Sequence, residues 1–169
     1  MTGKVLLPLL LASAAQAEKA WVFEPGQALV SVEMGPAKAR ISATSLDVSG
    51  RVRELEGGGI QAEVRLSASS FTTGSSARDQ KLDKDGEIVF EGRAAAPGKD
   101  GTLHLKGTLT FHGLSRPLEI PVHVVRAGGL AFGHASFILP LREFGIPAGE
   151  ARVDIDAGLR PEGALASRG

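Results

Sequence analysis

Residues Thr102–Phe111 read TLHLKGTLTF, and residues Pro117–Val125 read PLEIPVHVV. The same alternation of apolar and polar residues returns in Arg152–Arg160, which read RVDIDAGLR. Successive side chains of a β-strand point to opposite faces, so each segment has one apolar and one polar face. A chain built from such strands must curve until its apolar faces are covered. This alternation decides the fold, and the function then depends on what the covered interior holds.

Short alternating segments fill most of the chain, and no long stretch shows a convincing helical periodicity. Gly, Pro and Asp separate them at the spacing typical of sandwiches and barrels. The longest gap, Ser69–Gly86, predicts a loop with one short helical turn near Ala77–Leu82. The pattern favours an all-β antiparallel barrel or sandwich, and a barrel leaves no exposed edge strand. The strand candidates are Trp21–Phe23, Leu29–Met34, Ala39–Ala43, Leu46–Glu54, Gly59–Ser67, Glu87–Arg93, Thr102–Phe111, Pro117–Arg126, Leu130–Pro140 and Glu150–Arg160.

The first residues have the layout of a secretory signal peptide. Lys4 gives a positive start, Val5–Leu11 is a short apolar segment, and Ala15-Gln16-Ala17 is a small-x-small cleavage site. The apolar segment is too short to span a bilayer, which takes about 20 residues. We expect cleavage after Ala17, removal of residues 1–17, and a periplasmic or secreted protein. An uncleaved N-terminal helix or anchor is the alternative.

The composition excludes several classes of function. The chain has 19 basic and 19 acidic residues, whereas nucleic-acid-binding proteins usually carry a basic excess or a basic stripe. We therefore expect no nucleic-acid partner. The sequence has no second long apolar segment, so we expect no membrane-spanning segment after signal cleavage. Without cysteine, the exported chain must be held together by its core and strand ladders.

Large and small apolar residues share the inward register of these strands. The small ones, such as Ala62 and Gly107, leave room that a solid core would fill. We therefore predict a lumen that holds a long apolar molecule, and a fully packed core is the alternative. Burial of each methylene group contributes about 0.8 kcal/mol, so such a ligand can bind without polar contacts. The predicted wall residues are Val32, Leu66, Phe90, Leu105, Leu109, Phe111, Ile120, Val122, Ala135, Phe137, Leu139 and Ile155.

Side chains suited to catalysis or metal binding are dispersed. The histidines, His104, His112, His123 and His134, lack the tight spacing of zinc ligands. Asp154 and Asp156 share one strand face, but calcium takes six or more oxygens. The sequence has no nucleophile elbow, His-Glu-x-x-His motif or phosphate loop. We predict no enzymatic activity, no metal and no cofactor.

Several segments, in this order, resemble the YceI-like family of exported bacterial proteins. The family has an aromatic-x-hydrophobic-acid-Pro opening before a strand, an Arg-Asp-x-x-Leu segment carried here by Arg78, Asp79 and Leu82, and a Gly-x-Leu-Thr hairpin. The chain departs from it at Lys81, where the family often has His. The matching segments are Trp21–Val32, Val64–Leu82, Ile88–Phe90, Lys106–Val122, Phe144-Gly145-Ile146 and Val153–Leu159.

The resemblance implies a lipocalin-like fold, an extended eight-stranded antiparallel β-barrel. The barrel domain is expected over residues 18–160, and a disordered tail over 161–169. It also implies a lipid carrier or scavenger that holds a polyisoprenoid or another long-chain apolar molecule. The alternative is a ligand-free barrel that acts through its surface, as an accessory of an envelope or respiratory complex. A homodimer is compatible with either function.

Three cations are candidates for the mouth of the barrel. Arg78, Lys81 and Arg142 are predicted to meet an acidic head group at an opening of the lumen. The alternative is that all three belong to the solvated surface, with Arg78 and Asp79 forming a local ion pair.

Overall fold

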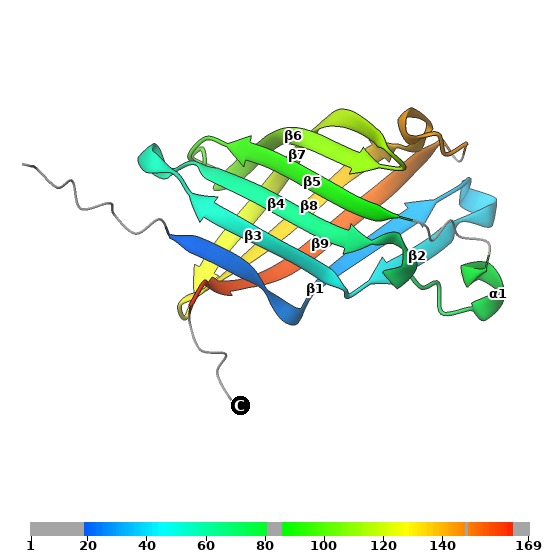
Figure 1. The fold of residues 1–169 in the computed structure, drawn as a ribbon, viewed down its shortest axis with the longest axis horizontal. Helices are drawn as coiled ribbons and strands as arrows, with labels where there is room; N and C mark the ends of the chain where they lie inside the picture. Colours follow the sequence, from blue (N-terminus) through cyan, green and yellow to red (C-terminus); the bar gives the residue numbers. More distant parts are fainter. Residues whose placement is uncertain (1–18, 81–85, 148, 164–169) are drawn as a thin grey trace, which may run out of the picture.

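The computed structural model describes residues 19–80, 86–147 and 149–163 (Figure 1). Residues 1–17, the expected signal peptide, and Lys81 lie outside the described residues. The described part is mostly strand, with one α-helical turn, α1 (Ser76–Asp79), and short 3-10 turns such as η4 (Leu141–Phe144). The strands are β1 (Ala20–Met34), β2 (Ile41–Ser45), β3 (Val48–Glu54), β4 (Ile60–Ser67), β5 (Glu87–Ala94), β6 (Thr102–Phe111), β7 (Leu114–Ala127), β8 (Leu130–Pro140) and β9 (Glu150–Pro161).

The strands form one antiparallel sheet that closes on itself. Strands β3 to β9 pair with one another in chain order, and β1 pairs with β9 on one side and with β2 and β3 on the other. β2 and β3 lie end to end along β1 and together count as one strand, interrupted at Leu46-Asp47. The result is a closed eight-stranded barrel, which confirms the fold class expected from the sequence. Among the described strands, closure leaves no long edge strand unpaired.

β1 is one strand where the sequence predicted two. Its pairing with β9 shifts register between Phe23 and Ala28, where Pro25 and Gly26 interrupt the alternation. β9 continues past this bulge and pairs with both halves, so the two short segments become one bent strand. Both described chain ends lie at the same end of the barrel, because Trp21 pairs with Pro161 (Figure 1).

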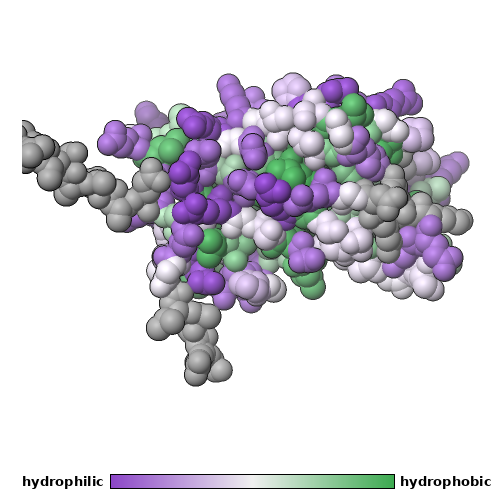
Figure 2. Space-filling model, in the orientation of Figure 1, coloured by the Kyte–Doolittle hydropathy of each residue, from purple (hydrophilic) through white to green (hydrophobic). Residues whose placement is uncertain are grey.

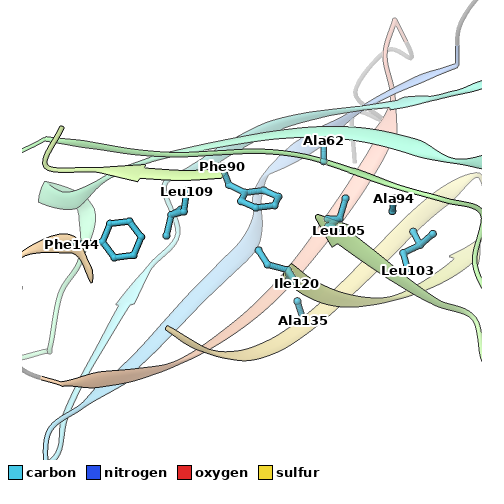
Figure 3. Close-up of a cluster of buried hydrophobic side chains, with 9 residues drawn as sticks. All are labelled: Ala62, Phe90, Ala94, Leu103, Leu105, Leu109, Ile120, Ala135 and Phe144. Atoms are coloured by element: carbon cyan, nitrogen blue, oxygen red, sulfur yellow. The ribbon is translucent and has the colours of Figure 1, made fainter. Parts of the chain in front are cut away.

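The inner face of the barrel is apolar along most of its length. Alternate residues of every strand point inward, and the largest buried cluster runs from Phe144 to Leu103 (Figure 3). Phe144 and Leu141 of η4 are 2% and 5% exposed. Phe144 packs into the cluster, so η4 covers the barrel interior from one end.

β5 and β6 approach closely where Gly92 lies opposite Gly107. A Cβ atom at Gly107 would meet the carbonyl oxygen of Glu91 and would lie 2.5 Å from the Cα atom of Gly92. A Cβ atom at Gly92 would lie 2.7 Å from the ring of Phe90. The glycine pair therefore lets the two strands bend together, and the Phe90 ring covers the space beside Gly92.

The loop before β5 contains α1, as the sequence predicted. Asp79 holds this loop together, because its carboxylate accepts hydrogen bonds from Thr72 Oγ1 at 2.9 Å and from the Thr73 backbone N–H at 2.7 Å. β9 continues through Pro161, where the tail was expected to begin, and the Glu162 backbone N–H donates to the carbonyl oxygen of Ala20. Residues 164–169 lie outside the described part of the chain.

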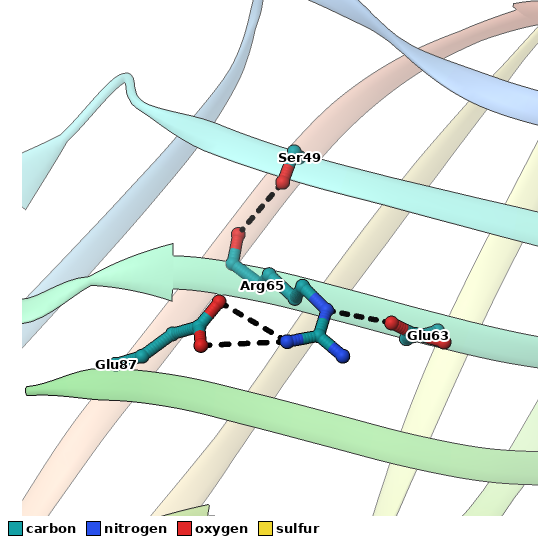
Figure 4. Close-up of polar contacts among 4 residues, drawn as sticks. All are labelled: Ser49, Glu63, Arg65 and Glu87. Atoms are coloured by element: carbon teal, nitrogen blue, oxygen red, sulfur yellow. Dashed lines mark hydrogen bonds and ion pairs between the residues drawn. The ribbon is translucent and has the colours of Figure 1, made fainter.

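The face shown in Figure 2 is mostly hydrophilic, with small hydrophobic areas between charged residues. On the outside of β3, β4 and β5, Arg65 donates to Glu63 at 2.6 Å and to Glu87 at 3.2 Å (Figure 4). These side chains are about half exposed, so each contact adds little stability. None of the helices in the described part of the chain is long and apolar enough to cross a membrane.

Candidate functional site: the barrel lumen

The lumen contains a cavity of about 240 Å³. Its wall is almost entirely apolar, and every strand except β2 contributes side chains to it. The structure therefore contains a void where the sequence left a packed core as the alternative. All of the predicted wall residues except Phe111 line this cavity. Whether they contact a ligand stays a prediction.

Phe111 is placed differently from the other predicted wall residues. It follows the inward register of β6 and packs against the buried cluster, but it does not line the cavity. Its ring is stacked on the imidazole of His112, with the ring centres 3.8 Å apart. His112 has a φ of 53° and begins the turn into β7. The Phe111 ring therefore packs beside the cavity at the end of β6, and not on its wall.

A polar cluster lies at the end of the cavity where the two described chain ends lie. It consists of Trp21 near the start of β1, Glu54 at the end of β3, and Arg126 near the end of β7. Trp21 Nε1 donates to Glu54 Oε1 at 2.9 Å, and Arg126 Nη2 donates to the same oxygen at 2.8 Å. The guanidinium of Arg126 also lies 5.3 Å from the centre of the Trp21 ring, a cation–π distance. We call these three residues the Glu54 cluster.

The residues of the Glu54 cluster were not among the predicted site residues, although the sequence holds a signal for them. Glu54 continues the inward register of Val52, and Arg126 continues that of Val124. A charged residue in an apolar register at the end of a strand marks a rim of a barrel, where an inward side chain can still reach water. The ends of β3 and β7 lie at the same end of the barrel because of the strand order, and alternation alone does not predict that order.

The environment of Glu54 favours its ionised form. Burial raises the pKa of the carboxyl group, but the hydrogen bonds from Trp21 and Arg126 and the charges of Arg126 and Lys19 lower it by more. The pKa of Glu54 therefore lies below the ordinary value of 4.5. The Glu54 side chain is 25% exposed and that of Arg126 is 61% exposed, so the cluster lies between the lumen and water.

A lowered pKa predicts that the Glu54 cluster stabilises the fold less in acid. Its contribution is complete above pH 4.5, the ordinary pKa, and is lost as the pH falls through the lowered pKa. We expect Glu54→Gln to lower the free energy of unfolding by about 1 kcal/mol at neutral pH. The difference from the wild type should shrink as the pH is lowered from neutral to well below 4.5. Urea unfolding across this range measures it, with the exposed Glu56→Gln as the control; a constant difference would contradict the assignment.

The two predicted mouth cations that the structure describes, Arg78 and Arg142, do not line this cavity. Arg78 is exposed on α1 and Arg142 is exposed on η4, and neither lines the cavity. Lys81 lies outside the described residues. The polar residues that do line the cavity belong to the Glu54 cluster, at the end opposite η4.

The barrel brings some histidines closer than the sequence suggested. His123 lies opposite His134 across β7 and β8, and His134 Nδ1 lies 2.7 Å from Asp156 Oδ1 on the outer face. Within residues 19–80, 86–147 and 149–163, no group of three or more His, Cys, Asp or Glu side chains is arranged to hold a metal ion.

A closed antiparallel barrel around an apolar cavity defines the lipocalin-like class of barrel. The sequence places the chain more narrowly. The family model for the YceI-like domain matches residues 21–160, and the chain belongs to this family.

One curated relative is a UPF0312 protein of Vibrio cholerae. It is 29% identical over 131 residues, a match that covers 74% of this chain and 65% of that protein. The chain therefore spans slightly less than two thirds of the length of this relative.

Several solved structures have the same fold. BcnA of Burkholderia cenocepacia gives a TM-score of 0.72 at 14% identity, covering 80% of this chain and 98% of that one. A polyisoprenoid binding domain from Saccharophagus degradans gives a TM-score of 0.63 at 12% identity, covering 83% of this chain and 98% of that one. The Campylobacter jejuni YCEI protein gives a TM-score of 0.62 at 13% identity, covering 75% of this chain and 87% of that one. At these identities the likeness shows the fold.

Proposed function

We propose that this protein is an exported binding protein, not an enzyme, that holds a polyisoprenoid or another long-chain apolar molecule in its lumen as a carrier or scavenger. The observation that carries this proposal is the apolar cavity of about 240 Å³ inside the barrel. A cavity of about 150 Å³ lined by apolar side chains already binds benzene. The family and the fold shared with a domain described as polyisoprenoid binding support the same function.

The size of the cavity favours a narrow chain. Pockets for drug-sized ligands span about 300–1,000 Å³, so the cavity is small for a bulky rigid molecule. A flexible chain can instead lie along the lumen, whose lining on β1 runs from Trp21 to Val32. Burying ten methylene groups contributes roughly 8 kcal/mol before the costs of binding. This gain is large enough for binding without a strong polar contact.

Native mass spectrometry of protein purified from the envelope of its own host, without detergent, tests this function. We expect a species heavier than the bare chain by the mass of one long-chain lipid, which denaturing the sample releases. The bare chain should begin at Glu18, as cleavage after Ala17 requires, and the same spectrum separates a monomer from a homodimer. Protein that is repeatedly empty and takes up no N-phenyl-1-naphthylamine, an apolar fluorescent dye, would contradict the proposal.

A further inference from the structure

The Glu54 cluster supplies all of the polar side chains that line the cavity among the described residues. Elsewhere a ligand in the lumen meets only apolar wall, and burying an unpaired polar group there costs several kcal/mol. A ligand that has one polar end will therefore place that end at the Glu54 cluster. The other end then points toward η4, where Phe144 covers the barrel.

The hydrogen bonds within the Glu54 cluster leave acceptor and donor positions open for a ligand group. Trp21 and Arg126 both donate to Glu54 Oε1, whereas an ionised carboxylate offers about four acceptor positions on its two oxygens. A guanidinium has five N–H donors, and the bond from Arg126 Nη2 uses one of them. The cluster can therefore accept one hydrogen bond and donate another to the same ligand group.

The charges of the cluster determine which group fits best. Glu54 and Arg126 are an ion pair at 2.8 Å, so the cluster as a whole is neutral. A carboxylate or phosphate head group would lie against the carboxylate of Glu54, and an ammonium would lie against Arg126, so each charged head group would meet a like charge at this site. A hydroxyl group donates one hydrogen bond and accepts two, so it can donate to Glu54 and accept from Arg126.

We propose that the Glu54 cluster binds the polar end of the lumen ligand and selects a neutral hydroxyl head group over a carboxylate or an ammonium. The ligand class is then a long-chain alcohol. This inference rests on the proposed function, since it concerns the same lumen. It also fixes the direction of the bound chain, with the hydroxyl at the start of β1 and the apolar tail toward η4.

Ligands with one chain and different head groups test the selection. We would measure displacement of N-phenyl-1-naphthylamine by 1-dodecanol, dodecanoate and dodecylammonium at neutral pH. Any apolar cavity disfavours a charged head group, so a preference of the wild-type protein for dodecanol does not test the role of the cluster. The change of this preference in variants of the cluster does. Glu54→Gln keeps the shape of the side chain and leaves the charge of Arg126 unbalanced. We expect the ratio of dodecanol to dodecanoate affinity to fall by about fivefold or more in this variant.

Two further variants separate the possible outcomes. Arg126→Gln should raise the relative affinity for dodecylammonium by a similar factor, since Glu54 then lacks its cation. Glu56→Gln, exposed in the neighbouring turn, should leave every ratio unchanged. Unchanged ratios in Glu54→Gln and Arg126→Gln, with the dye still bound, would overturn the head-group assignment and leave the proposed function standing. A wild-type protein that is repeatedly empty after purification and does not bind the dye would overturn both.

Discussion

Ala135→Trp is expected to weaken the binding of N-phenyl-1-naphthylamine by more than tenfold. Ala135 lies on β8 between Val122 and Ile155 of the neighbouring strands, is 5% exposed, and lines the cavity. Its small side chain leaves part of the lumen open, and an indole at this position would occupy the space that a ligand needs. Fluorescence titration with the dye measures the affinity, and native mass spectrometry checks the loss of lipid.

The control for this substitution lies on the same strand. Ile138 points outward and is 54% exposed, so Ile138→Trp adds the same group outside the barrel and should leave the affinity unchanged. Overpacking a core costs about 1–3 kcal/mol, so thermal unfolding must show that Ala135→Trp is folded. If it is not folded, Ala135→Leu fills less space and should still weaken binding severalfold. Wild-type affinity in a folded Ala135→Trp would show that the ligand does not occupy this cavity.

Gly107→Ala is expected to lower the free energy of unfolding by about 3 kcal/mol. The new Cβ atom would meet the Glu91 carbonyl oxygen and would lie 2.5 Å from the Cα atom of Gly92. Both atoms belong to the backbone of β5, which cannot move aside as a flexible side chain can. The substitution must therefore push β5 and β6 apart at the point where they bend together.

Gly133→Ala is the matched control. It places the same methyl group on an inward position of β8, where the nearest atom is Val122 Cγ1 at 3.6 Å, an ordinary contact distance. We expect a change within about 1 kcal/mol, because alanine also reduces the entropy of the unfolded chain. Urea unfolding of both variants measures the difference. Equal stabilities would show that the close approach at Gly107 does not constrain the barrel.

The alternation of apolar and polar residues was sufficient to predict which side chains face the inside for most of the wall. A side chain such as Phe137 or Leu105 could be assigned to the inside because position in a strand fixes the face on which it lies. The same rule placed Phe111 on the inward face, but it could not show that the ring, which stacks on His112 where the strand ends, does not line the cavity. It also split β1 at Pro25 and Gly26, because local breakers do not reveal that β9 pairs on both sides of the bulge.

The polar end of the site could not be predicted in the same way. Arg78 and Arg142 are conspicuous in the sequence because they stand in loops beside the strands, yet neither lines the cavity. Glu54 and Arg126 are separated by 72 positions and meet because β3 and β7 end at the same rim of a closed barrel. Long-range pairing of this kind depends on strand order and on the direction of each strand.

The sequence by itself determined that this protein is built of strands with one apolar face each, because position in a strand fixes the face on which a side chain lies. It also determined the family. Only the tertiary structure decided that the interior holds a void and that Trp21, Glu54 and Arg126 lie at one end of it. Both properties depend on how strands that are distant in the sequence are brought together in space. The alternation within one strand carries no information on how far that strand lies from the others.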